Sequence, residues 1–307
     1  MWGNARALVA LVVALGTGVI AGCNSPTYNA ACTGATVAAT AGPVTDPALT
    51  EISGIDTGVA NPDVWWVHND SGHPNVVYAL DATGAVRGTY TVAGATALDW
   101  EDLTVAPGPT PGSGTVFVGD IGDNAAARPE IQVYRFAEPT VPLSGSPAVA
   151  TLPAADVLHL TYPDGAHDAE TLMYDPATGD LVVVTKVLTG GTVGLYRAPA
   201  NAAAGSTTVL TKIRDLALPT GLANAVTAGD ISSDGRTLAL RTYGSIRVYA
   251  RVDSWTLNRL FDFKACTVTV PGELQGESIG FDASAVGRSL VTVSEGAGQT
   301  IHLTRAP

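Results

Sequence analysis

The stretch Asp99–Asn124 decides the fold: it reads D-W-E-D-L-T-V at 99–105 and T-V-F-V-G-D-I-G-D-N at 115–124, joined by a Gly/Pro-rich turn. Each run is a short apolar segment typical of a buried β-strand. Acidic residues lie at the start of the first run and at the end of the second. Both sets make sense if they face one common opening, so the stretch predicts two strands with carboxylates gathered at one edge.

The same pattern recurs along the chain at intervals of about 50 to 70 residues. An acid opens each unit, followed closely by an apolar residue; these acids are Glu51, Glu101, Glu170, Asp230 and Glu277. A second strand then ends on polar residues, a third carries an aromatic residue near its end in most units, and a more variable fourth strand usually follows. Four short strands per repeat predict an all-β fold, a β-propeller of five blades. Six blades and a pair of β-sandwiches are the alternatives. A pair of sandwiches would not explain why an acid recurs at the same position of each repeat.

The chain ends directly after the third strand of the fifth unit, so an N-terminal strand around residues 35–40 is expected to close the ring. Closure would bring Cys32 near the outer edge of the last blades, where Cys266 lies in a fourth-strand region. In an oxidising compartment these two cysteines are a candidate disulfide, and two buried thiols are the alternative.

The N-terminus has the composition of a targeting segment. Arg6 is followed by the apolar run Leu8–Ile20, which is short for a membrane span, and then by Ala21-Gly22-Cys23. Small residues before a cysteine are similar to a bacterial lipobox, which implies cleavage before Cys23, lipidation of Cys23 and export. An ordinary secretory signal is the alternative. We therefore expect a signal peptide at 1–22, a tether at 23–32 and a propeller domain at 33–307.

The formal net charge of −12 argues against a nucleic-acid partner, which would require a basic face. We expect a monomer that is anchored to the membrane through Cys23 on the extracytoplasmic side.

In a propeller the first strand of each blade lines a central channel, so the opening acids should converge at one mouth. Carboxylates crowded together repel one another and require protons, hydrogen bonds or a cation. A hard cation with oxygen ligands, Ca²⁺ above all, is the simplest partner. The candidate ligands are Glu51, Asp70, Glu101, Asp120, Asp123, Glu170, Asp230 and Glu277. The alternative is that each acid accepts backbone N–H groups and fixes a turn.

Short motifs add a family resemblance over most of the mature chain. E-I-S-G-I at 51–55, V-H-N-D-S-G at 67–72, D-W-E-D-L-T-V at 99–105, V-G-D-I-G-D-N at 118–124 and D-A-E-T-L at 168–172 are similar in order and spacing to phytase-like, or esterase-like, propeller proteins. The resemblance implies a five- or six-bladed ring and Ca²⁺-dependent hydrolysis of phosphate or carboxylic esters. The sequence departs from the family pattern at Asp102, Thr171 and Asp230, and Lys186 and Arg241 are the only obvious basic residues for a phosphate.

Two classes of function follow. In the first, a bound ion polarises a phosphoryl or carbonyl oxygen and His68 or a ring carboxylate activates water; the candidate catalytic residues are His68, Glu101, Lys186 and Arg241. In the second, the protein is a non-catalytic scaffold that binds a small molecule or another ligand of the cell envelope.

Overall fold

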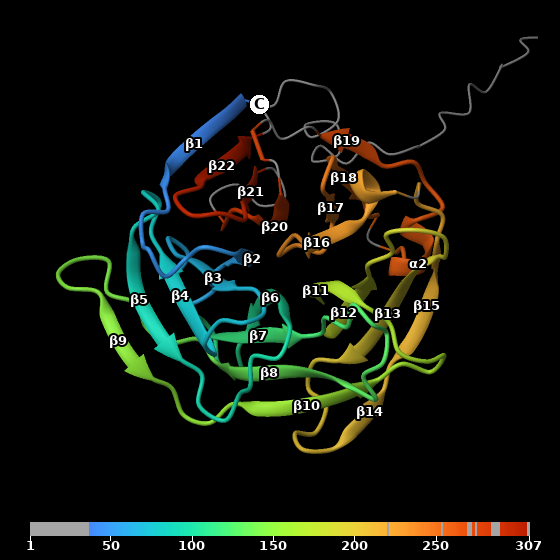
Figure 1. Ribbon diagram of the computed structural model, residues 1–307, viewed down its shortest axis with the longest axis horizontal. Helices are drawn as coiled ribbons and strands as arrows, with labels where there is room; N and C mark the ends of the chain where they lie inside the picture. Colours follow the sequence, from blue (N-terminus) through green and yellow to red (C-terminus); the bar gives the residue numbers. More distant parts are fainter. Residues whose placement is uncertain are drawn as a thin grey trace, which may run out of the picture.

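The computed structural model confirms an all-β propeller of five blades arranged as a ring (Figure 1). It describes residues 37–219, 221–252, 254–268, 272–273, 275–283 and 289–305. The signal peptide, Cys23, the tether and Cys32 lie outside these residues, so lipidation of Cys23 and a Cys32–Cys266 disulfide stay predictions. Among the described residues, no helix is long and apolar enough to span a membrane.

Each blade is a twisted sheet whose strands lie side by side, the first next to the channel and the last at the outer edge. Blade 1 contains β2 (Ile52–Thr57), β3 (Trp65–Asn69), β4 (Val76–Leu80), β5 (Val86–Thr91) and β9 (Ala148–Thr151). Blade 2 contains β6 (Trp100–Pro107), β7 (Gly114–Asp120), β8 (Ile131–Ala137), β10 (Asp156–Thr161) and β14 (Thr207–Val209). Blade 3 contains β11 (Ala169–Asp175), β12 (Asp180–Thr185), β13 (Val193–Pro199) and β15 (Thr211–Leu216). Blade 4 contains β16 (Val226–Ile231), β17 (Thr237–Thr242), β18 (Ser245–Ala250) and β19 (Cys266–Val268). Two short helices, η1 (Leu222–Asn224) and α2 (Leu257–Leu260), lie in connections.

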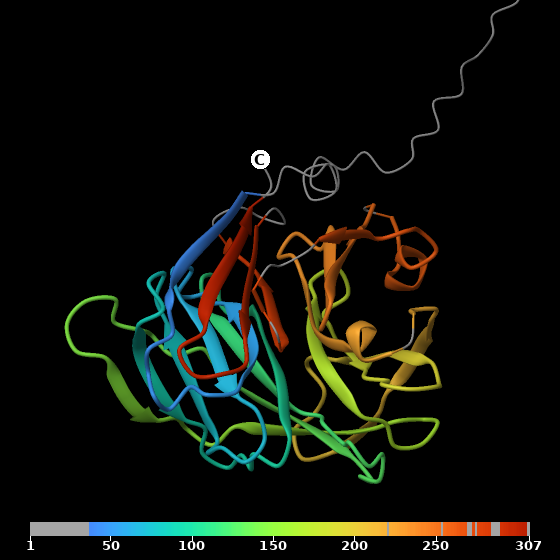
Figure 2. The same cartoon turned by 45° about the horizontal axis from the view of Figure 1, so that its top comes forward.

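Blade 5 joins the two ends of the described chain. It contains β20 (Gly276–Phe281), β21 (Ser289–Ser294), β22 (Thr300–Arg305) and the N-terminal strand β1 (Val37–Pro43). β1 pairs antiparallel with β22, with Ala39 opposite Leu303, and the two strands lie side by side in Figure 2. The predicted closure of the ring by an N-terminal strand is therefore confirmed.

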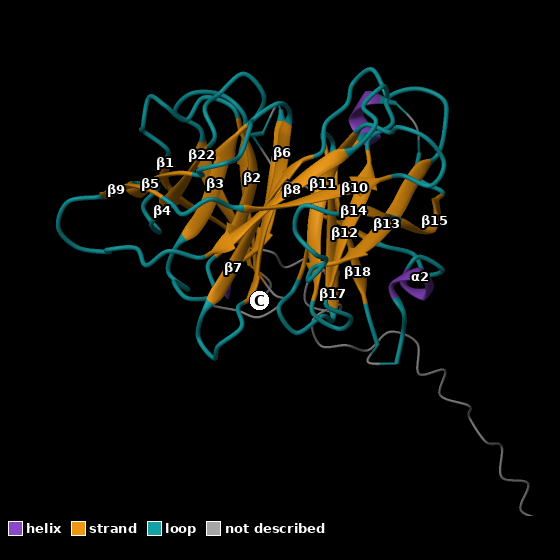
Figure 3. Ribbon diagram, turned by 90° about the horizontal axis from the view of Figure 1, so that it is seen from below, coloured by secondary structure: helices purple, strands orange, loops and turns teal. Residues whose placement is uncertain are grey.

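The extra length of the second and third units forms outer strands rather than a sixth blade. β9 adds to blade 1 in parallel with β5, and β14 adds to blade 2 in parallel with β10. Each extra strand comes from the chain segment of the following blade, so neighbouring blades are interlocked at their outer edges. Figure 3, a side view, shows β9 at the perimeter of the ring.

Large apolar side chains fill the space between blades. Trp66 and Trp100 are fully buried in one apolar cluster that blades 1 and 2 share, and the Trp66 ring lies 5.5 Å from that of Tyr90. Strands buried on both faces explain why the sequence shows continuous apolar runs instead of a clean alternation. This packing fixes the five inner strands around the channel.

Every inner strand carries a β-bulge one residue after its start. The residues at the bulge are Ser53, Glu101, Glu170, Thr227 and Glu277. A bulge re-aims a side chain and increases the local twist. The structural repeat therefore aligns Ser53 and Thr227, rather than Glu51 and Asp230, with the three glutamates.

Candidate functional site

Three bulge glutamates converge at the channel mouth where the inner strands begin, called here the acidic mouth. Glu101, Glu170 and Glu277 are each 5% exposed or less. In the two remaining blades the bulge residue is a hydroxyl that bonds the next blade: Ser53 donates to the carbonyl of Glu101 at 2.5 Å, and Thr227 donates to that of Gly276. Three blades thus supply carboxylates and two supply structural links.

Loop residues complete the cluster. Carboxylate oxygens of Asp70, Glu277 and Glu295 lie within 4.8 Å of one another, and those of Asp70, Asp99 and Glu101 do the same. Asp70, in the loop after β3, belongs to both groups. The acidic mouth therefore offers two sets of three carboxylates joined through one shared aspartate, and a set of oxygen ligands of this kind suits a hard divalent cation.

Burial is the main reason that the pKa values of several of these acids are raised. Desolvation raises the pKa of Glu101 and of Glu170 well above the usual range, and mutual repulsion adds to the shift. Desolvation likewise raises the pKa of Asp70 to about 6 and that of Glu295 to about 9. One oxygen of Glu170, Oε2, is buried and has no hydrogen-bond partner within the described residues. A cation bound among the clustered carboxylates would relieve the repulsion.

Lys186 supplies an internal positive charge at the mouth. Its Nζ contacts Glu170 Oε1 and donates to the Tyr243 hydroxyl at 3.2 Å, and Tyr243 in turn donates to Glu277 at 2.6 Å. The ammonium group therefore bonds only one of the three bulge glutamates directly. Lys186 lies at the mouth, but it does not neutralise the group around Asp70.

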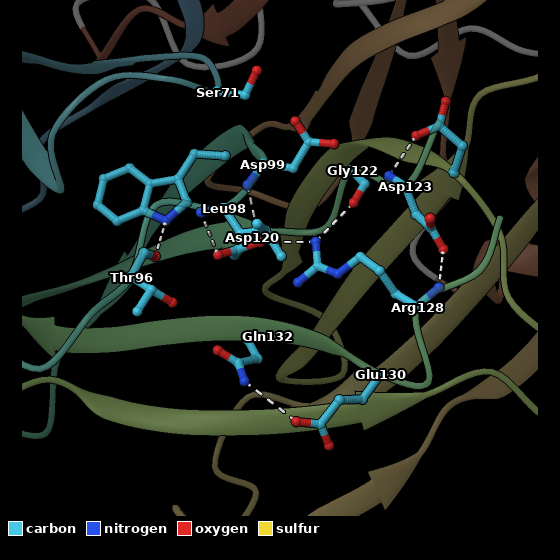
Figure 4. Close-up of polar contacts among 12 residues, drawn as sticks. Ser71, Thr96, Leu98, Asp99, Asp120, Gly122, Asp123, Arg128, Glu130 and Gln132 are labelled. Carbon is cyan, nitrogen blue, oxygen red and sulfur yellow. Dashed lines mark hydrogen bonds and ion pairs between the residues drawn. The ribbon is translucent and has the colours of Figure 1, made fainter. Parts of the chain in front are cut away.

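Asp120 and Asp123, predicted as metal ligands, instead organise a loop (Figure 4). Asp120 forms an ion pair with Arg128 at 2.8 Å and accepts the backbone N–H of Asp99 at 3.2 Å. Asp123 accepts the backbone N–H of Arg128 at 2.7 Å, and its own N–H donates to Asp168 at 2.8 Å. These two acids match the alternative in which a carboxylate fixes a turn, and Asp120 also holds the backbone of Asp99 in place.

Asp230 does not join the acidic mouth. It lies near the other end of β16, where its carboxylate accepts the N–H groups of Ile231 and of Phe281 in blade 5, both at 2.7 Å. There it lines a cavity of about 220 Å³ at the opposite mouth, together with Asp56. Asp56 makes the equivalent link from blade 1 to the N–H of Val105 in blade 2 at 2.6 Å. The prediction that all five opening acids converge is wrong for Asp230. It was aligned with the glutamates without knowledge of the bulge, and the bulge residue of its blade is Thr227.

A buried layer lies between the two mouths. It consists of the residues that follow each bulge: Gly54, Asp102, Thr171, Ala228 and Ser278. Asp102 accepts the N–H of Leu172 in blade 3 at 3.0 Å, so it acts as another link between blades. The acidic mouth and the opposite cavity are therefore separate places on the molecule.

Two predicted catalytic residues are positioned for structural roles. His68 is fully buried, its Nδ1 bonds the carbonyl of Asn69 at 2.8 Å, and burial lowers its pKa to about 4. Arg241 is buried, forms an ion pair with Glu273 and donates to the carbonyl of Ser278 at 2.9 Å. His68 is closed off from the mouth, and the guanidinium of Arg241 is already paired. Neither residue is suited to the catalytic role predicted for it.

Glu51 lies at the rim, where it is half exposed and bonds His73 Nδ1 at 3.2 Å. Asp99, Glu295 and Tyr243, which are absent from the predicted ligand set, are part of the mouth. A signal for Asp99 was present, because D-x-E occurs at both 99–101 and 168–170, each ending at a bulge glutamate. Glu295 follows the second strand of its unit, as Asp70 follows that of blade 1.

Comparison with models of known protein families gives no match. No curated protein matches the chain either. The fold itself defines the class of this protein, a five-bladed β-propeller.

Proposed function

We propose that the protein binds a divalent cation, Ca²⁺, at the acidic mouth, and that it is an exported, lipid-anchored relative of the phytase-like propellers. The observation that supports this most is the pair of carboxylate groups joined through Asp70. The residues that would hold the ion are Asp70, Asp99, Glu101, Glu277 and Glu295. Export rests on the segment 1–22 and Cys23.

A ligand-binding protein of the cell envelope fits this site best. Arg128 and Arg241 are paired with Asp120 and Glu273, and Lys186 with Glu170, so the described residues at the mouth offer no unpaired basic group for a phosphate. The calcium-loaded mouth would instead hold an oxygen-rich ligand through the ion.

Metal-assisted hydrolysis of phosphate or carboxylic esters is the second candidate, favoured by the shared position of Asp70. Two carboxylate groups that share one aspartate could bind two metal ions, and a pair of metal ions stabilises the attacking and leaving oxygens of a displacement reaction. The ion would supply polarisation of the ester oxygen. A carboxylate of the mouth that does not bind the ions would take the proton from water, the role predicted for His68 or a ring carboxylate.

Calcium titration of the chain without residues 1–22, by calorimetry, tests the proposal. Asp70→Asn should weaken calcium binding at least tenfold, about 1.4 kcal/mol, because it removes a ligand from both groups. Asp156→Asn, which removes an exposed acid paired with Arg135 on the outer flank, is the matched control and should bind normally. Absence of calcium binding by the unmodified chain would exclude the metal site.

A panel of chromogenic phosphate and carboxylic esters then separates the two candidates. Turnover that disappears both with chelator and in Asp70→Asn supports the hydrolase. Calcium binding without turnover supports the envelope ligand-binding protein.

A further inference from the structure

A second site of opposite charge lies on the outer flank, between blades 3 and 4. It is a cavity of about 240 Å³ whose lining includes Arg214, Arg247, Lys264, Tyr249, Phe261 and Phe263. In Figure 1, α2 lies beside β15 of blade 3, and β18 and β19 of blade 4 lie farther round the ring. Among the described residues, no acid lines the cavity, although the chain carries 28 acids and only 16 Lys and Arg.

Arg247 is the residue that points to a ligand. It lies on β18 opposite Thr267 of β19, and its Nε is buried without a hydrogen-bond partner in the described part of the chain. A guanidinium nitrogen removed from water and left unbonded is costly, and since Arg247 lines the cavity, the other nitrogens of the same guanidinium offer donors to an anion with several oxygens. In an acidic protein, a carboxylate could have paired with this guanidinium, and none of the described residues places one in the cavity.

Arg214 provides the second positive charge, from β15 on the facing blade. One nitrogen, Nη1, bonds Asp262 Oδ1 and the carbonyl of Asn258, both at 2.8 Å. Asp262 is 59% exposed, so this pair is weakened by solvent. Its other guanidinium nitrogens have donors left for a second anion, because an arginine carries five N–H groups.

Aromatic rings form the rest of the wall. Tyr249 and Phe261 pack edge to face with centroids 4.8 Å apart, and Phe263, which is 39% exposed, stacks on Trp255 at 4.2 Å. An exposed aromatic ring that is held rigid beside two arginines offers a flat apolar surface next to an anion site.

We propose that this flank pocket binds a phosphate group attached to a flat apolar body. Arg247 and Arg214 hold the phosphate oxygens, and Phe263 and Tyr249 contact the body. The site is independent of the acidic mouth, since it lies on the perimeter and selects anions without a metal ion.

Calorimetric titration of phenyl phosphate into the chain without residues 1–22, with chelator present, tests this proposal. Saturable binding is expected at ligand concentrations up to about 10 mM, the range of weak small-ligand sites. Inorganic phosphate should bind at least threefold more weakly than phenyl phosphate, and phenol should not bind. No saturable binding of phenyl phosphate would overturn the site, and equal binding of inorganic phosphate would overturn the role of the rings.

Variants locate the binding. Arg247→Gln and, separately, Arg214→Gln should each weaken phenyl phosphate binding at least tenfold while leaving the thermal melt cooperative. Arg87→Gln, which removes the same charge from blade 1, is the control and should bind as the unmodified chain does. A loss in Arg87→Gln equal to that in Arg247→Gln would show a general charge effect and would overturn the pocket. Because Arg214 and Arg247 lie on different blades, one variant still tests the site if the other fails to fold.

Discussion

Space at the acidic mouth depends on the missing side chain of Gly122. A Cβ at this position would collide with Oε1 of Glu101 and with the carboxylate of Asp99. The second glycine of V-G-D-I-G-D-N therefore leaves room for two carboxylates of one candidate ligand group. Sequence reasoning found the motif but could not assign this purpose to the glycine, because the contact joins segments that meet only through the β6–β7 hairpin.

Gly122→Ala is expected to weaken calcium binding about tenfold, close to 1.4 kcal/mol, because Asp99 and Glu101 must move apart to admit the methyl group. Calorimetric titration measures this effect. Asn124→Ala, an exposed position in the same loop, should leave the affinity unchanged. Equal affinities of Gly122→Ala and the unmodified chain would remove Asp99 and Glu101 from the ion site.

At the level of elements, β1 is the strand that completes the ring. Five of its seven residues pair with β22, and the strand covers an edge that would otherwise be exposed. A chain beginning at Val44 should lose about 3 kcal/mol or more of unfolding free energy, since several ladder hydrogen bonds of about 0.5–1.5 kcal/mol each disappear. Urea unfolding measures the loss. A chain beginning at residue 36 is the matched control, because it also lacks Cys32 but keeps β1; equal stability of the two chains would contradict closure by β1.

The elements also explain which predictions from the sequence succeeded. Four-strand periodicity and the abrupt end of the fifth unit were sufficient for the blade number and the closure, because both depend on strand count alone. The bulges were not visible, since a bulge inserts one residue and shifts the inward-facing positions after it. That shift explains why Asp230 was aligned with the glutamates, although Thr227 occupies their position. His68 was expected at the mouth from its place near a strand end, yet its register directs it into the protein.

At the level of the whole molecule, the excess of buried acid makes stability depend on pH in an unusual direction. The raised pKa values of Asp70, about 6, Asp56, about 7, and Glu295, about 9, lie above those of the unfolded chain. The folded state thus retains protons that the unfolded state has already released in this window. Stability from these groups is fully present below about pH 4 and is lost as pH rises through about 6 to 9.

Without divalent ions, the unfolding free energy should fall by about 4 kcal/mol between pH 5 and pH 8 from Asp70 and Asp56 alone, since their pKa values lie about one and two units above pH 5 and each unit corresponds to about 1.4 kcal/mol. Calcium should reduce this fall, because an ion at the acidic mouth favours the ionised carboxylates and stabilises the state that binds it. Urea unfolding at both pH values, with chelator and with calcium, gives the four free energies required.

Glu101→Gln separates the mouth from the rest of the molecule. A neutral amide removes one titrating group at this site, so the fall in stability without calcium should be shallower and the recovery with calcium smaller. Asp56 belongs to the opposite mouth, and its contribution should persist in this variant. Stability in chelator that stays constant or rises from pH 5 to pH 8 would mean that the clustered acids are ionised at little cost, and the principal reason for a cation at the mouth would then be lost.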